Sequence, residues 1–170
     1  IFAVAFFAIS STVDIYKKDW ELFLKLEKAL PSWEFKSFGG QCRDGAIAPI
    51  EEVAKKMGEA TLIYQVKNQG DGYGHNIFTA AAMGKPLIVR KSDYVGKLAE
   101  PLITPYTSII VDYLDAGEIG KIIEECYEPG YAISPQLPKE RSENIYQAFK
   151  DNVDFDKEQL SIESFLQKLI

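Results

Sequence analysis

The pattern that most constrains the fold lies between residues 61 and 89, where two apolar strands flank a loop and a short helix. Thr61–Val66 is a largely apolar run, typical of a strand buried on both faces. Three glycines follow within residues 70–74, then an alanine-rich helix that Gly84 is expected to end, and then a second apolar strand at Pro86–Val89. This order predicts parallel strands, because a helical connection returns the chain in the same direction.

Strand and helix patterns alternate along the rest of the chain as well. Further strands are expected at Ile1–Ile9, Trp33–Ser37 and Ser108–Val111. Helices are expected at Asp19–Ala29, Ile50–Met57 (with Gly58 as the stop), Ala116–Tyr127, Lys139–Phe149 and Asp156–Leu169. We therefore predict an α/β fold: one Rossmann-like, three-layer α/β/α domain over residues 1–170, with a mainly parallel sheet of about five strands, and C-terminal helices that cap or cross over the sheet.

Composition and charge exclude several classes of protein. The apolar content of 46% argues against disorder, and a net charge of -6 without a basic run argues against binding to nucleic acid or to an anionic membrane surface. Ile1–Ile9 is too short for a transmembrane segment, which needs about 20 residues. Because this strand begins the chain without a Met, we expect a piece of a longer protein. Cys42 and Cys126 form no Cys-x-x-Cys motif, so we expect thiols in a reducing compartment, the cytoplasm.

The glycine loop suits a phosphate or diphosphate, because the helix after it presents amide donors and the positive end of its dipole. It is not the dinucleotide fingerprint, since His75 stands at the third glycine position and the loop follows the third strand. NAD is therefore disfavoured.

Ligands of such sheets bind beyond the carboxyl ends of the strands. We expect one rim to be formed by the loops Ser10–Lys18, Gly39–Ile47, Lys67–His75 and Arg90–Tyr94.

The run Asp71-Gly72-Tyr73-Gly74, followed by Ala80 to Ile88, resembles the donor-binding segment of two-domain, GT-B type glycosyltransferases of the group 1 family. Those enzymes carry Glu-Gly-Phe-Gly, a helix bearing a second Glu, and then Ala-x-x-x-Gly-Lys/Thr-Pro-Val/Ile. Weaker similarity extends to the flanks, so the resemblance covers nearly the whole chain. It implies the C-terminal, nucleotide-sugar-binding half of a hexosyltransferase-like enzyme, whose N-terminal acceptor-binding domain lies outside these residues.

The resemblance also implies roles for individual residues. Asp71 would bind hydroxyl groups of the donor sugar, and the amides of Gly72, Tyr73, Gly74, His75 and Asn76 would bind the diphosphate. Lys17 or Lys18 would add positive charge to the same phosphates. No metal ion or other cofactor is implied, because fixed amide dipoles can stabilise a leaving diphosphate.

Three departures from the family pattern accompany the resemblance. Thr79 stands in the place of the second glutamate, a ribose ligand, and Ser11 lies in a Ser10-Ser11-Thr12 run where the family commonly has an arginine. One strand-helix unit of the family is missing between Leu30 and Ile47, so the base pocket, which we place at Gly39–Ile47, is expected to be remodelled. His75, the sole histidine, is a candidate acid or base, although a structural role at the helix start is the commoner one.

The predicted function is donor binding for a glycosyltransferase of glycan biosynthesis, inactive as this isolated domain. The alternative is a non-catalytic ligand-binding or interaction domain that retains the glycosyltransferase fold. A third reading is a flavodoxin-like or regulatory α/β domain.

Overall fold

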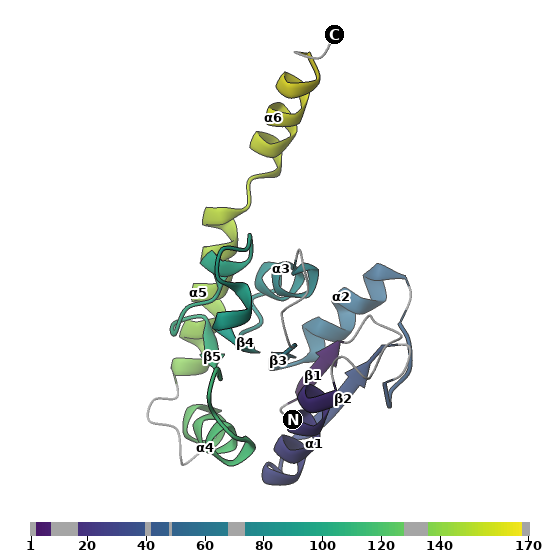
Figure 1. Cartoon of the computed structure of the whole chain (residues 1–170), viewed down its shortest axis with the longest axis vertical. Coiled ribbons are helices and arrows are strands. Elements are labelled where there is room, and N and C mark those ends of the chain that lie inside the picture. The colour runs from purple at the N-terminus through teal and green to yellow at the C-terminus, as the bar shows by residue number, and fades with distance from the viewer. Residues whose placement is uncertain are drawn as a thin grey trace.

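The structure, a computed structural model, describes residues 3–7, 17–39, 42–47, 49–67, 74–127 and 136–167. Its elements in chain order are β1 (Ala3–Phe7), α1 (Lys17–Ala29), β2 (Glu34–Phe38), α2 (Ile50–Glu59), β3 (Leu62–Gln65), α3 (His75–Ala82), β4 (Leu87–Val89), the 3-10 helices η2 (Lys91–Tyr94) and η3 (Glu100–Leu102), β5 (Ser108–Ile110), α4 (Ala116–Tyr127), α5 (Leu137–Asn152) and α6 (Phe155–Gln167). Figure 1 shows their arrangement.

The five strands form one parallel sheet in the order β2-β1-β3-β4-β5. The chain moves outward from β1 to β2 and then crosses back to place β3 on the other side of β1. This reversal creates a topological switch point between the carboxyl ends of β1 and β3, which is where open sheets of this kind bind their ligands. The predicted α/β class and mainly parallel sheet are confirmed.

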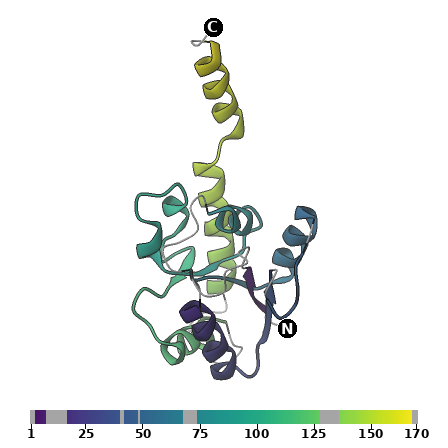
Figure 2. The ribbon, with the colours of Figure 1, turned by 45° about the vertical axis from the view of Figure 1, so that its right-hand side comes forward.

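Two apolar cores lie on opposite faces of the sheet and produce the predicted three layers. Along β3 the side chains alternate, with Leu62 and Tyr64 in one core and Ile63 in the other. Helices α1 and α4 cover the first face, whereas α2, α3 and α5 cover the second (Figures 1 and 2).

Glycines have two different roles at the ends of α2 and α3. Gly84 ends α3 as predicted, with a φ of 63° and an amide that donates to the carbonyl of Ala81 at 3.0 Å. The predicted end of α2 at Met57, with Gly58 as the stop, is two residues too early, because α2 continues through Gly58 to Glu59. A Cβ at Gly58 would lie 2.8 Å from Cε of Met83, so this glycine allows α2 to approach the end of α3.

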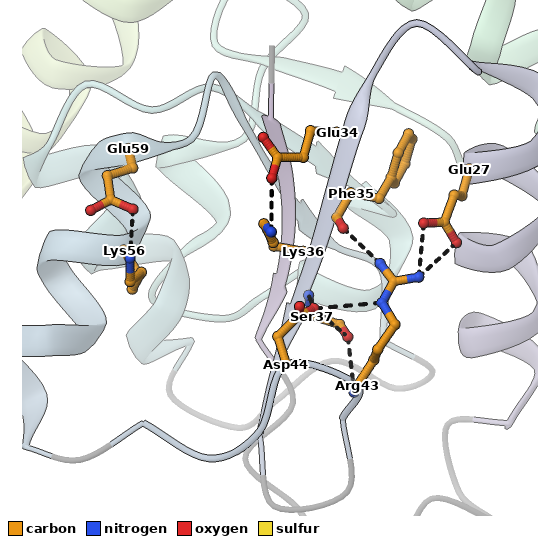
Figure 3. A network of polar contacts seen from close by, with 9 residues as sticks. All are labelled: Glu27, Glu34, Phe35, Lys36, Ser37, Arg43, Asp44, Lys56 and Glu59. Atoms are coloured by element: carbon orange, nitrogen blue, oxygen red, sulfur yellow. Dashed lines mark hydrogen bonds and ion pairs between the residues drawn. The ribbon is translucent and has the colours of Figure 1, made fainter. Parts of the chain in front are cut away.

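The free edge of β2 is covered by side chains of the loop that follows it (Figure 3). Arg43 donates through Nη2 to the carbonyl of Phe35 at 2.6 Å, and through Nη1 to the Glu27 carboxylate at 2.8 Å. The Ser37 amide donates to Oδ2 of Asp44 at 2.7 Å, and the Ser37 carbonyl accepts from the Asp44 amide at 2.9 Å. These contacts occupy backbone groups that would otherwise be open to pairing with another strand.

The last two helices differ in burial. Ile145 of α5 is completely buried, whereas α6 has no buried residue and projects away from the sheet (Figures 1 and 2). The prediction that both helices cap or cross over the sheet is therefore correct for α5 and wrong for α6. Among the described helices, none combines the length and the apolar content needed to cross a bilayer.

Candidate functional site at the switch point

The candidate site lies at the carboxyl edge of the sheet, around the first turns of α1 and α3. All strands are parallel, so the segments that follow β1, β2, β3 and β4 leave the sheet at the same edge. The predicted common rim is therefore confirmed for the described parts of those loops. Helix α1 follows β1 and α3 follows β3, which places the two helix starts on either side of the switch point.

Gly74 begins α3 in a conformation that other residues rarely adopt. It is the N-cap residue, with φ 77° and ψ 34°, and its carbonyl accepts from the amides of Ile77 at 2.8 Å and Phe78 at 3.2 Å. A Cβ at this position would lie 3.1 Å from Cβ of Ala99, close to η3. Glycine is thus needed here for its backbone conformation and for close packing.

A chain of buried polar side chains lies beneath the first turn of α3. Asn76 is 4% exposed, and its Nδ2 donates to Oε1 of Gln65 at 3.4 Å. Gln65 is completely buried in β3, and its Nε2 donates to the hydroxyl of Tyr94 at 3.3 Å. Burying an amide is unfavourable unless it is hydrogen-bonded, so these contacts fix the side chains relative to one another.

A buried ion pair holds the first turn of α1. Asp19 is 1% exposed, and its Oδ1 lies 2.7 Å from Nη1 of Arg90, the residue after β4. Asp93 lies 3.9 Å from the same nitrogen. The Tyr64 hydroxyl donates to the backbone carbonyl of Asp19 at 3.0 Å. Burial, and secondly the charge of Asp19, raise the pKa of Tyr64 well above its usual range, so this hydroxyl remains a donor.

Strand β3 therefore anchors both helix starts from adjacent residues. Tyr64 points to one face of the sheet and reaches the first turn of α1, whereas Gln65 points to the other face and reaches the first turn of α3. This arrangement follows from the alternation of side chains along a strand. The two helix starts beside the switch point are consequently fixed to the same strand end.

The structure describes six of the predicted site residues and leaves the others outside its described range. Lys17 and Lys18 are exposed on the first turn of α1, and His75 is exposed on the first turn of α3. Thr79 is half-buried, and its hydroxyl donates to the carbonyl of His75 at 3.0 Å. Gly74 and Asn76 lie at the start of α3, as given above. The predicted donor ligands Ser11, Asp71, Gly72 and Tyr73 lie outside the described residues.

Three further sequence predictions concern the cysteines, the base pocket and the absence of a metal ion. Cys42 and Cys126 carry thiols and no disulfide, as predicted. The described part of the expected base pocket, Gly39–Ile47, includes Arg43 and Asp44, whose contacts are with β2 and α1. The base pocket remains a prediction. Within the described residues, no group of three His, Cys, Asp or Glu side chains is arranged to hold a metal ion.

Sequence reasoning placed the loop Arg90–Tyr94 at the rim, but it did not identify the side chains that support the two helix starts, namely Asp19, Tyr64, Gln65, Arg90 and Tyr94. Gln65 and Arg90 were the available signals, since each interrupts or directly follows an apolar strand run. Their partners, Tyr94 and Asp19, carried no comparable signal because each belongs to a segment with an ordinary pattern. Buried polar residues in strands are therefore the feature that could have pointed to this part of the rim.

Comparisons with known proteins agree with this geometry at the level of the fold. No protein-family model and no curated protein matches the sequence. HepE of Anabaena, solved in complex with UDP-glucose, matches with a TM-score of 0.73 and 18% identity over 98% of this chain and 49% of HepE. A glycosyltransferase of Rickettsia africae matches with a TM-score of 0.69 and 15% identity over 99% of this chain and 48% of that protein.

The chain spans about half the length of these solved structures. The matches have low sequence identity, and the similarity lies in the α/β architecture described above. In its fold, the chain is similar to about half of HepE and to about half of the Rickettsia africae glycosyltransferase.

Proposed function

We propose that this chain is the donor-binding half of a glycosyltransferase and binds a nucleotide diphosphate sugar at the switch point. The observation that carries the proposal is the start of α3 at Gly74, which the contact of Asn76 with Gln65 holds beside the end of β3, in a fold shared with a protein solved with UDP-glucose. The first amides of a helix have no acceptor within the helix and point along its axis. They suit the oxygens of a diphosphate.

Each predicted ligand has a chemical role in this proposal. The amides of Gly72 to Asn76 bind the diphosphate, and Asp71 accepts hydrogen bonds from sugar hydroxyls. Lys17 and Lys18, both exposed at the start of α1, supply positive charge from the other side of the switch point. With a net charge of -6 on the chain, an anionic ligand depends on such local donors.

The same groups assist transfer of the sugar. As the glycosidic bond breaks, negative charge grows on the leaving nucleoside diphosphate. Amide dipoles that are already oriented stabilise this charge without reorganising, so the site needs no metal ion for this purpose. His75 is exposed at the edge of this site, where it can take part in proton transfer near the phosphates.

The acceptor belongs to a second domain in this proposal. The chain covers only about half of each solved neighbour. Helix α6 also presents large apolar side chains that the described part of the chain leaves exposed by 52% to 69%, namely Phe155, Leu160, Ile162, Phe165 and Leu166. A surface of this kind suits burial against another domain. The isolated chain should therefore bind the donor without transferring the sugar.

One observation favours the non-catalytic alternative. Thr79 replaces the glutamate that the resemblance assigns to the ribose, and its hydroxyl already donates to the carbonyl of His75. A hydroxyl also has a single oxygen, so it cannot bind two ribose hydroxyls bidentately as a carboxylate can. A domain that has lost this contact could retain the fold and serve as a binding or interaction module.

Calorimetric titration of UDP, GDP and ADP into the chain separates the two functions. We expect saturable heat with UDP and a rise in melting temperature of a few degrees at saturating ligand. An assay of UDP-glucose with simple sugar acceptors should show no transfer by the isolated chain. Absence of heat with all three nucleotides, together with an unchanged melting temperature, would favour the non-catalytic domain. Measurable transfer would contradict the need for a second domain.

A further inference from the structure

We propose that Gln65 and Tyr94 are positioning residues for the diphosphate site, because together they orient the first turn of α3 through Asn76. This inference rests on the proposed function. Neither residue touches the ligand in this scheme. Their effect is to hold the amides that do.

Two hydrogen bonds connect Tyr94 through Gln65 to Asn76, in the first turn of α3. Tyr94, in η2, is completely buried, and its hydroxyl accepts from Gln65 at 3.3 Å. Gln65 accepts from Asn76 at 3.4 Å. Asn76 is the second residue of α3, so its side chain belongs to the turn whose amides face the proposed ligand.

Tyr94 also contacts the site through its ring. A Cβ added at Gly74 would lie 3.8 Å from Cε1 of Tyr94, and Nζ of Lys97 lies over the same ring, 5.4 Å from its centroid. The ring therefore packs beneath the N-cap of α3 while its hydroxyl bonds to β3. Removing only the hydroxyl leaves this packing in place, which makes Tyr94→Phe a mild and specific change.

The chemistry of Gln65 argues for orientation rather than for general stability. Gln65 pairs in register with Val89 and lies two residues after Ile63 in β3, and both of these residues belong to the apolar core on the α3 face of the sheet. A buried carboxamide is favourable only when its donors and acceptors are matched, and such matching permits few rotations of the partner. Here the hydrogen bond with Gln65 restricts the orientation of the Asn76 side chain, and with it that of the first turn of α3.

The test compares nucleotide binding by Tyr94→Phe and Gln65→Leu with that of the wild type. We expect each variant to weaken UDP binding by about three- to tenfold, which corresponds to the loss of one oriented hydrogen bond. Hydrogen exchange of amides in the first turn of α3 should also become faster. The matched control is Tyr127→Phe, which removes a buried phenol hydroxyl from the end of α4 and should leave the UDP titration unchanged.

The outcomes distinguish this inference from the function on which it rests. If the wild type binds UDP and both variants bind equally well, Gln65 and Tyr94 have no positioning role and the proposed function stands. If the wild type does not bind UDP, the proposed function is wrong, and this inference, which depends on it, is wrong as well. Should Gln65→Leu not fold, Tyr94→Phe alone decides the matter. Weaker binding by Tyr127→Phe as well would show a general loss of stability and overturn the inference.

Discussion

Replacement of Arg90 by methionine is expected to lower the free energy of unfolding by about 3 kcal/mol. The change leaves the Asp19 carboxylate 1% exposed and without the guanidinium that lies 2.7 Å away. Methionine retains much of the volume of the arginine stem, so the loss measures the removal of the guanidinium charge rather than a cavity. Urea denaturation followed by circular dichroism provides the measurement.

The matched control removes both charges. The double variant Asp19→Leu with Arg90→Met removes both members of the 2.7 Å pair, so much of the lost stability should return, whereas Asp93 loses the same cation in both variants. The contact from the Tyr64 hydroxyl to the backbone of residue 19 does not depend on the Asp19 side chain. If the free energy of unfolding of Arg90→Met lies within about 0.5 kcal/mol of the wild-type value, the ion pair does not hold α1 to β4 as described.

Replacement of Gly74 by valine is expected to lower the stability by about 3 kcal/mol and to abolish UDP binding. A β-branched residue strongly disfavours a φ of 77°, and its Cβ would lie 3.1 Å from that of Ala99. Relief of this contact moves the start of α3, which carries the proposed diphosphate donors. Thermal unfolding and UDP calorimetry on the same sample measure both effects.

Gly96 offers a matched control for this change. It has a φ of 73°, and among the described residues no atom lies within 4 Å of a Cβ placed there. Gly96→Val therefore introduces the backbone strain without the steric contact. We expect a smaller loss of stability and an unchanged UDP titration. Equal effects of the two substitutions, or normal UDP binding by Gly74→Val, would disprove the role given to Gly74.

The fold could be predicted because its determinants are local in the sequence. Apolar runs such as Thr61–Val66 and Pro86–Val89 define strands regardless of their neighbours, and Gly74 and Gly84 mark the start and end of α3 through their backbone conformations. Alternation of these runs with helices is sufficient to predict parallel strands. The carboxyl edge as the place of the candidate site then follows from topology.

The contacts that support the site could not be predicted in the same way. Asp19 and Arg90 lie 71 residues apart, and Gln65 and Tyr94 lie 29 apart, so their pairing depends on the order of strands in the sheet. The role of Gly58 depends similarly on Met83, which approaches from another helix. Side-chain pairing of this kind becomes visible only when the elements are placed in space.

Helix α6 illustrates a different reason for failure. Its pattern of apolar residues correctly predicted a helix, and we expected that helix to cover the sheet. A periodic pattern shows that a helix has an apolar face but does not identify the surface that buries it. In the described structure, α5 covers the sheet at Ile145, whereas the apolar side chains of α6 remain exposed.

The most direct test of the proposed site is a titration of the isotope-labelled chain with UDP, observed by NMR at each backbone amide. We expect the largest saturable shifts at the amides of residues 72–76, and smaller shifts in the first turn of α1. Shifts that are largest elsewhere, for example at residues 42–47, or no shifts at millimolar UDP, would contradict the binding of a diphosphate at the start of α3.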